Sequence, residues 1–150
     1  MENDPLKIVK NLCILFEGIY LRPYLCPAGI PTIGIGSTHY EDGRRVTLAD
    51  PAITRERAEE LLMWELQKEC VPRVLKLCAT LPGWGPGAMA AILDFTYNLG
   101  SGNLASSTLR KRILAGDKEG AKAELMKWVK GGGKVLPGLV RRRGAEAALI

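Results

Sequence analysis

The chain has 150 residues, of which 47% are hydrophobic and 25% are charged, and its formal net charge is +5. This length suits one domain with a core of its own, and the composition excludes a disordered or low-complexity chain. The isoelectric point of about 9.1 favours an anionic partner such as nucleic acid, a membrane surface or an acidic polymer like the cell wall. A basic surface without a special partner is an equally good interpretation.

The chain has four cysteines and one histidine, namely Cys13, Cys26, Cys70, Cys78 and His39. No pair of cysteines has CxxC spacing, so we expect no structural zinc site, no other metal and no cofactor. The first uninterrupted apolar run, residues 12–16, is too short for a membrane span or a secretory signal. We therefore expect the protein to accumulate in a reducing cytoplasm with its cysteines as free thiols.

The N-terminal pattern predicts a helix. Asp4 followed by Pro5 is typical of a helix start, and apolar residues then recur at three- and four-residue steps as far as Leu21, before Pro23. Glu17 would lie at the margin of the buried face, near the end of this helix.

A small β-sheet is expected next. From Thr32 onward, glycines alternate with isoleucines, and Asp42 followed by Gly43 is typical of a hairpin turn. The sequence therefore predicts two or three short antiparallel strands.

The remainder of the chain is predicted to be helical. Thr54 is a candidate helix cap, with Ile53 as its hydrophobic staple, and Pro72 should kink or break the helix that follows. The expected helices cover residues 55–70, 85–100, 106–116, 117–132 and 136–150, the second as the central core helix. Strands near the N-terminus followed by many helices predict the α+β class, with a ligand cleft between a hairpin lobe and a helical lobe.

The stretch FEGIYLRPYLCPAGIPTIGIG, residues 16–36, carries three side chains suited to catalysis. Glu17 stands beside aromatic and apolar residues, where a carboxyl group loses hydration and becomes a candidate proton donor. A surface glutamate in a cap or an ion pair is the alternative. Cys26 lies in a proline-stiffened loop that suits a positioned group, but a free cysteine is often a small buried apolar residue. Thr32 is also consistent with a plain strand residue.

These three residues together form a more specific pattern. The order Glu, eight residues, Cys, five residues, Thr, followed by IGIG, resembles the phage-type lysozymes, or endolysins, of glycoside hydrolase family 24. LDFTYNLGSG resembles the central helix of that family and the turn after it, and SSTLRKRILAGD and GGGKVLPGLVRRRGAE resemble its C-terminal signatures. The resemblance covers about residues 15–149, nearly the whole chain.

The resemblance implies a lysozyme-like α+β fold, with a small N-terminal β-hairpin lobe, a mainly helical C-terminal lobe and the cleft between them. It implies a single domain over residues 1–150, with lobes of about residues 14–60 and 61–150 and the first helix packing on the C-terminal lobe. The implied activity is that of a muramidase, which hydrolyses the β-1,4 bond between N-acetylmuramic acid and N-acetylglucosamine in peptidoglycan by an inverting mechanism. Its use would be host cell lysis by a phage or prophage.

By the same resemblance, Glu17 is the catalytic acid, Cys26 occupies the second catalytic position and Thr32 supports it. The family usually has an aspartate at the position of Cys26, so the identity of the base stays open. Three forms of Cys26 are possible in this role: a thiolate, a neutral thiol that only places water, or a thiol assisted by Thr32. A nearby basic group such as Arg22 would favour the thiolate. Oxidation of Cys26, or its pairing with Cys13 or another thiol, would remove its ability to hold water.

The resemblance also implies substrate contacts at Thr38, Tyr97 and Thr108, or at Ser107 beside Thr108. A core or helix-cap role for these residues is equally consistent with the sequence. One residue of the run Arg141, Arg142 and Arg143 is expected to pair with Glu17, although an arginine run is more often solvated than buried. His39 is expected to be exposed and not to be a ligand.

Peptidoglycan is therefore the expected partner, and we expect a monomer without a stable membrane anchor. We place the protein in the host cytoplasm before release and then in the periplasm or cell wall, which requires a holin-type pore. A toxin or wall-remodelling muramidase is one alternative, and a weak or inactive lysozyme-like domain that binds glycan or a protein is another. Binding to nucleic acid is not expected, because the short basic runs LVRRRG and LRKR lack a recognition motif.

Overall fold

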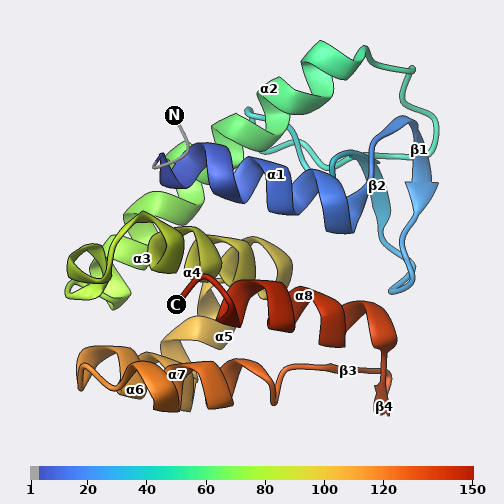
Figure 1. Ribbon diagram of the computed structural model, residues 1–150. Coiled ribbons are helices and arrows are strands. Elements are labelled where there is room, and N and C mark those ends of the chain that lie inside the picture. Colours follow the sequence, from blue (N-terminus) through green and yellow to red (C-terminus); the bar gives the residue numbers. More distant parts are fainter. Residues whose placement is uncertain (1–3) are drawn as a thin grey trace. The chain divides into compact units, whose positions relative to one another are not determined.

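The computed structural model describes residues 4–150, and Figure 1 shows that this part of the chain consists mostly of helices with two short β-hairpins. The predicted α+β class is confirmed. The residues form two compact units, one from Lys10–Glu69 and the other from residues 4–9 together with Cys70–Ile150. No helix among the described residues is long and apolar enough to cross a membrane.

Helix α1, Pro5–Glu17, begins where the sequence predicts and ends earlier. The side chain of Asp4 caps it by accepting a hydrogen bond from the Leu6 N–H at 3.0 Å. The helix stops after Glu17 because Gly18 takes the left-handed conformation, with a φ of 75°. The expected end near Leu21 is therefore wrong, and Glu17 becomes the last residue of the helix.

The next residues form an antiparallel hairpin of β1, Tyr20–Leu25, and β2, Pro31–Gly34. The paired residues are Tyr20 with Gly34, Tyr24 with Thr32, and Leu25 with Pro31. Strand β1 was not predicted, because its residues were assigned to a helix end and a proline loop. The pairing is irregular between Tyr20 and Tyr24, and an irregularity of this kind accommodates Pro23 within a strand.

The segment after β2 turns at Asp42 and Gly43, as the sequence predicts. The Tyr40 N–H donates to the carbonyl of Arg44 at 2.9 Å across this turn. In place of a third strand, the segment forms two isolated bridges: Ser37 pairs with Ile33 of β2, and His39 pairs with Arg45 within the segment itself. The carboxylate of Asp50 fastens the loop by accepting a hydrogen bond from the Tyr40 hydroxyl at 2.7 Å.

Helix α2, Arg55–Glu65, covers β2 and completes the first unit. The buried cluster of this unit contains Ile33, Val46 and Leu61, with Tyr40 and Ile53 packed against it. Thr54 caps the helix, since its hydroxyl accepts a hydrogen bond from the Arg57 N–H at 3.1 Å. The predicted cap is confirmed.

The helical run that follows Thr54 changes its form before Pro72. Residues Leu66–Cys70 form one π-helical turn, and α3 then occupies Val71–Leu77. Proline lacks an N–H and its ring clashes with the carbonyl four residues earlier, so a wider turn before Pro72 removes the conflict. The predicted break is therefore a change of helix type.

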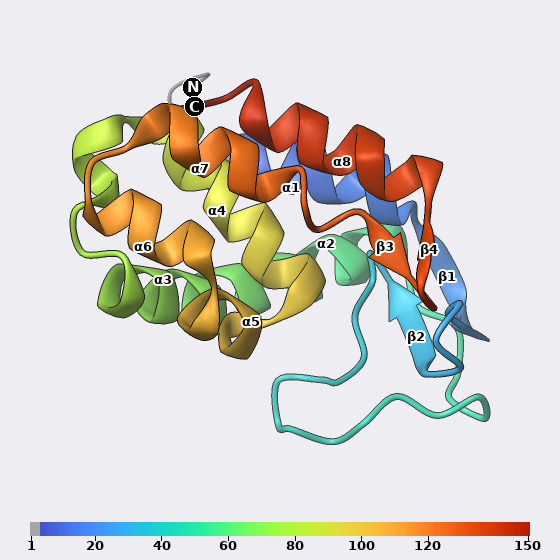
Figure 2. The same ribbon diagram turned by 90° about the horizontal axis from the view of Figure 1, so that it is seen from below.

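Helix α4, Pro86–Leu99, is the centre of the second unit, as predicted for the core helix. All residues from Ala88 to Thr96 are buried, so neighbouring elements cover the helix on every side. The elements that contact α4 are α3, η2 (Leu81–Trp84), α5 (Ser101–Ser106) and α8 (Pro137–Ala147). Helices α6 (Thr108–Leu114) and α7 (Lys118–Leu125) pack on each other, α6 also on α5 and α7 also on α8. Figure 2 shows α7 and α8 side by side, and α8 packs directly on α4.

Helix α5 was not predicted from the sequence, and α7 ends earlier than predicted. Helix α7 ends at Leu125, well before residue 132. Beyond it, β3, Lys130–Gly131, and β4, Lys134–Val135, form a small second hairpin. Its turn uses Gly132 and Gly133 at φ values of 59° and 80°, a conformation that glycine adopts without strain.

Candidate active site

The three predicted catalytic residues all lie in the unit Lys10–Glu69 and come from consecutive elements of the chain. Glu17 is the last residue of α1, Cys26 directly follows β1, and Thr32 lies within β2. In Figure 1 the hairpin of β1 and β2 stands at the C-terminal end of α1. One helix end and one hairpin therefore carry all three side chains.

The register of this hairpin explains the spacing between Cys26 and Thr32. Tyr24 is paired directly with Thr32, and directly paired residues point their side chains to the same face. Side chains two residues apart on a strand also share a face, which adds Cys26 to the face of Tyr24. The Cys26 N–H continues the pairing by donating to the carbonyl of Ile30 at 3.0 Å. Cys26 and Thr32 therefore lie together on one face.

The thiol of Cys26 is half-buried and has a lowered pKa. Burial alone raises the pKa of this thiol, but hydrogen bonds from the backbone at Ile30 and Ala28 and from the Thr32 hydroxyl outweigh burial and lower it. The cause is therefore hydrogen bonding within the turn, and not the nearby Arg22 that the sequence suggested. This environment favours the thiolate form, which is the nucleophilic and basic form of cysteine.

Thr32 is fixed by its own hydrogen bonds. Its side chain is 2% exposed, and its hydroxyl donates to the carbonyl of Ile30 at 2.8 Å. The same hydroxyl is within hydrogen-bonding reach of the Cys26 sulfur. The hydroxyl carries one hydrogen, so it donates either to this carbonyl or to the Cys26 sulfur, and only donation to the sulfur favours the thiolate.

Glu17 lies against the backbone of the turn that follows β2. A Cβ atom placed on Gly36 would be 2.8 Å from both the carboxyl carbon and one carboxylate oxygen of Glu17. Gly36 also has a φ of +75°, which L-residues with side chains rarely adopt. Only glycine fits both conditions, so the half-buried carboxyl group packs directly on the chain at this point.

Tyr24 belongs to the same group of side chains, although it is not among the site residues predicted from the sequence. It faces the same side of the hairpin as Thr32, and its ring lies 4.3 Å from the ring of Tyr20, measured between centroids. Burial raises the pKa of Tyr24 to about 12, with further contributions from the negative charges of Glu17, Tyr20 and Cys26. Had β1 been predicted as a strand, the two-residue spacing of Tyr24 and Cys26 would have placed both side chains on one face of the hairpin.

Thr38 and His39 follow the glycine turn in the same unit. Thr38 is half-buried, and its hydroxyl lies 3.4 Å from Nδ1 of His39. The other ring nitrogen, Nε2, lies 3.0 Å from a carboxylate oxygen of Glu69. The expectation that His39 is exposed is therefore wrong, because this contact holds its ring in a half-buried position.

The remaining substrate-contact candidates lie in the helical unit. Tyr97 is half-buried in α4, and Thr108 is the exposed first residue of α6. The hydroxyl of Ser107 accepts a hydrogen bond from the Arg110 N–H at 3.0 Å and donates to the carbonyl of Leu104 at 2.7 Å. Ser107 therefore caps α6, which leaves Thr108 as the accessible hydroxyl at this point.

The arginine run in the middle of α8 is partly buried, contrary to the expectation of a solvated run. Arg141 is exposed, whereas Arg142 is 4% exposed and Arg143 is fully buried. Arg142 makes two hydrogen bonds to the carboxylate of Asp94 in α4, at 2.8 and 2.9 Å. Arg143 donates to the side-chain oxygen of Asn98 at 2.5 Å. The pairing of one of these arginines with Glu17 stays a prediction.

The buried acid Glu146 completes this cluster. Its carboxyl group lies 3.2 Å from Nε of Arg143 and interacts with the carboxyl group of Asp94. Burial, together with the neighbouring Asp94, raises the pKa of Glu146 well above its ordinary value. Although burial opposes ionisation of Asp94 too, hydrogen bonds from Glu146 and Arg142 lower the pKa of Asp94. Of the two carboxyl groups, Glu146 is therefore the one whose protonated form the fold favours.

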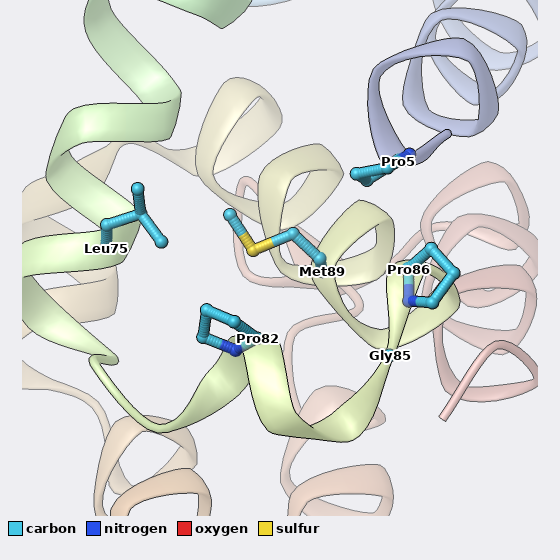
Figure 3. Close-up of a pocket in the computed structure, with 6 residues that line it drawn as sticks. All are labelled: Pro5, Leu75, Pro82, Gly85, Pro86 and Met89. Carbon is cyan, nitrogen blue, oxygen red and sulfur yellow. The ribbon is translucent and has the colours of Figure 1, made fainter. Parts of the chain in front are cut away.

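Figure 3 shows a shallow hollow in the helical unit, of about 340 Å³. Its lining is Pro5, Leu75, Pro82, Gly85, Pro86 and Met89. It contains none of the predicted site residues and no titratable side chain, so it offers no acid–base chemistry. Within residues 4–150, no group of three or more His, Cys, Asp or Glu side chains is arranged to hold a metal ion.

Comparison with known proteins relates most of the chain to phage enzymes. Residues 15–146 match the family described as phage lysozyme. The endolysin of Acyrthosiphon pisum secondary endosymbiont phage 1 is 37% identical over 147 residues, which cover 94% of this chain and 94% of that endolysin. The endolysin of Bacillus phage B103 is also 37% identical, over 142 residues. This chain spans 51% of the length of that relative.

The fold is shared with solved phage endolysins. An endolysin from Escherichia coli O157:H7 phage FAHEc1 superposes with a TM-score of 0.76 at 30% sequence identity. The superposition covers 95% of this chain and 90% of the endolysin. The similarity therefore extends over both compact units.

Proposed function

Because the chain belongs to the phage lysozyme family, it is a lytic muramidase of the bacterial cell wall, and we propose that Glu17 and Cys26 carry out its hydrolysis. The bond cleaved is the β-1,4 linkage between N-acetylmuramic acid and N-acetylglucosamine. The observation that supports the assignment most strongly is the hairpin register, which groups Cys26 with Thr32 and surrounds the thiol with hydrogen bonds that lower its pKa.

In the proposed mechanism, protonated Glu17 donates its proton to the glycosidic oxygen as the carbon–oxygen bond breaks. The backbone of Gly36, against which the carboxyl group packs, limits the positions that the acid can take. Positive charge develops on the sugar ring in the transition state, and water attacks the anomeric carbon from the face opposite to the leaving oxygen. This attack inverts the configuration at that carbon.

Cys26 acts on the attacking water. As a thiolate it accepts the proton that water loses when it bonds to the sugar, so the two catalytic groups exchange their protonation states once in each cycle. The lowered pKa of the Cys26 thiol supports the thiolate over a neutral thiol that only places the water. Thr32 holds the sulfur through its hydroxyl.

The assignment is tested by measuring the release of reducing sugar ends from purified peptidoglycan. We expect Glu17→Gln to lose at least a hundredfold in kcat, since the amide cannot donate the proton. Glu56→Gln is the matched control, because Glu56 is exposed in the first turn of α2. Full activity of Glu17→Gln would overturn the acid assignment. Sedimentation with peptidoglycan but no hydrolysis by the unmodified protein would favour a binding module.

We infer substrate contacts for Thr38, Tyr97 and Thr108. Two hydroxyls and one aromatic ring match the polar edges and the apolar faces of a sugar chain. A monomer that acts in the periplasm or cell wall, and that leaves the host cytoplasm through a holin-type pore, is consistent with these inferences. The net charge of +5 suits an anionic envelope.

A further inference from the structure

His39 connects a proposed substrate contact to a helix end within the unit Lys10–Glu69. Its ring nitrogen Nε2 lies 3.0 Å from a carboxylate oxygen of Glu69, in the π-helical turn Leu66–Cys70. Its other nitrogen, Nδ1, lies 3.4 Å from the hydroxyl of Thr38, at the long end of the hydrogen-bonding range. The side chains of His39 and Glu69 are 27% and 24% exposed, so water only partly screens this pair. One ring therefore stands between a carboxylate and a hydroxyl.

The backbone of Thr38 and His39 is held by the segment that faces it. The Val46 N–H donates to the carbonyl of Thr38 at 2.9 Å, and His39 forms an antiparallel bridge with Arg45. Directly paired residues point their side chains to the same side. The charged groups that face the ring thus come from two elements, the exposed Arg45 across the bridge and Glu69 from the π-helical turn.

The contact with Glu69 determines which nitrogen of the neutral ring carries the hydrogen. An ionised carboxylate only accepts hydrogen bonds, so the hydrogen between it and the ring is on Nε2. The neutral ring then has a lone pair on Nδ1, and the Thr38 hydroxyl donates its single hydrogen to that nitrogen. Both lone pairs of the hydroxyl oxygen stay available, so Thr38 offers the substrate an acceptor and no donor.

Protonation of His39 removes this fixed orientation. Both nitrogens of a histidine cation are donors, so Nδ1 then donates to the Thr38 oxygen. The ring occupies one lone pair of that oxygen, and the hydroxyl hydrogen moves to an outward position. A sugar hydroxyl pairs with either form of Thr38, because it both donates and accepts. An acetamido N–H only donates, so it binds more strongly when the ring is neutral.

Resting on the substrate contact assigned to Thr38 above, we propose that His39 is a positioning residue for substrate binding. Held by Glu69, its neutral ring fixes the Thr38 hydroxyl as an acceptor for an acetamido N–H of the sugar chain. His39 makes no contact with the sugar in this role, and its effect belongs to binding and not to the chemical step. Its protonation sets the lower pH limit of tight binding, separately from the ionisation of Cys26.

The position of the hydrogen is measured directly by NMR. His39 is the only histidine of the chain, so an untagged, isotope-labelled sample gives the signals of one imidazole. Long-range proton–nitrogen correlation spectra distinguish Nδ1 from Nε2 and follow the ring through its titration without any need for activity. Above the titration midpoint we expect the hydrogen on Nε2. A neutral ring with its hydrogen on Nδ1 would overturn the proposal, because Thr38 could not then donate to the ring.

Binding is measured as KM on purified peptidoglycan across the same pH range. We expect KM to rise by between about twofold and tenfold as His39 becomes protonated, the usual effect of weakening one hydrogen bond. The midpoint should equal that of the NMR titration. Because kcat follows the ionisation of Cys26 instead, the two kinetic parameters should titrate separately.

Four variants separate the contributions. Thr38→Val keeps the branched shape without the hydroxyl and should show the high KM at every pH. His39→Asn should show the low KM at every pH, since its side-chain oxygen accepts in place of Nδ1 and never gains a proton. Glu69→Gln should lower the midpoint of the NMR and KM profiles by roughly 0.5 pH unit, the size expected for a partly exposed ion pair. Glu56→Gln removes an exposed carboxylate of the same unit and should change neither profile.

A KM that stays constant through the NMR titration, or one that keeps its pH dependence in His39→Asn, would also overturn the proposal. An unchanged KM in Thr38→Val would instead remove the substrate contact on which the proposal rests. The NMR result is independent of that contact, because it reports the ring in the free protein. Thermal unfolding of each variant, with a Tm close to that of the unmodified protein, establishes that the fold is retained.

Discussion

The carboxyl group of Glu17 lies directly against the backbone of Gly36, with no room for a Cβ atom between them. In Gly36→Ala, the new methyl group must push the acid away from its position. A displacement of about 1 Å lowers the rate of a positioned reaction by roughly a hundredfold. We expect kcat on purified peptidoglycan to fall by between about tenfold and a hundredfold, with little change in KM.

Gly43→Ala is the matched control for this substitution. Gly43 has a φ of +86°, so alanine there meets the same backbone strain, but no atom lies within 4 Å of the added Cβ. It should lose about 1 kcal/mol of stability and keep its activity. If both variants lose activity to the same degree, backbone strain and not the displacement of Glu17 is the cause.

The lowered pKa of Cys26 predicts the pH dependence of hydrolysis. If the thiolate is the base, activity rises with pH as Cys26 ionises, at a pH below that of an ordinary thiol. Cys26→Asp should move this rise to lower pH, because a carboxyl group ionises earlier. Cys26→Ser should abolish the rise, since a hydroxyl does not ionise in this range. These profiles are measured as kcat/KM between about pH 4 and 9.

The serine variant also decides between the two interpretations of the thiol. A neutral group that only places water works equally well as a hydroxyl. Unchanged activity of Cys26→Ser at every pH would therefore show that ionisation of Cys26 is irrelevant to catalysis.

Mild oxidation should inactivate the enzyme through Cys26. Among the four free cysteines, Cys13, Cys70 and Cys78 are buried, whereas Cys26 is half-buried with a lowered pKa. Its thiolate is thus the site where peroxide forms a sulfenic acid, which a thiol reductant reverses. We expect loss of turnover on treatment with hydrogen peroxide and recovery with dithiothreitol. Equal turnover before and after oxidation would contradict this, and Cys26→Asp, which keeps an ionisable group at this position, provides an oxidation-insensitive control.

The sequence predicted the helices that have strong end signals. Asp4, Thr54 and Ser107 accept hydrogen bonds from backbone N–H groups at helix starts, and such caps are local features that one sequence reveals. The core helix α4 was equally clear, because a long apolar run between Pro86 and Gly100 has few alternatives.

Strand β1 could not be predicted from local pattern alone. Its residues continue the apolar spacing of α1, and the helix ends at Gly18 only because that residue takes a left-handed conformation. The pairing of β1 with β2 is a tertiary effect that overrides local preference. For this reason the spacing of Cys26 and Thr32 was recognised as a pattern, while Tyr24, which the same register places beside them, was missed.

The burial of Arg142 and Arg143 likewise depends on partners that the sequence does not place. A run of three arginines is solvated in isolation, and only the packing of α8 on α4 brings the run to Asp94 and Asn98. Residues separated by more than forty positions form this cluster. The partners of these buried arginines can therefore be identified only in the folded chain.

The carboxyl pair in this cluster predicts how stability depends on pH. The pKa of Glu146 is raised in the folded state, mainly by burial, so folding retains a proton that the unfolded chain releases above its ordinary pKa. The contribution of Glu146 to the free energy of unfolding is complete at pH values below its ordinary pKa, and it is lost as pH rises toward the raised pKa. Asp94 has a lowered pKa, so its contribution is lost only in acid, as pH falls through that lowered value.

Glu146→Gln should therefore flatten the decline in stability above about pH 5. The amide stays neutral and can still donate a hydrogen bond to Asp94, so the free energy of unfolding at pH 7 to 8 should equal or exceed that of the unmodified protein. Asp94→Asn is the contrasting variant, because it leaves Arg142 buried without its counter-charge, at a cost of about 3–5 kcal/mol. Urea unfolding at a series of pH values measures both effects. A Glu146→Gln curve that declines as steeply as that of the unmodified protein would show that Glu146 is not the group that holds the proton.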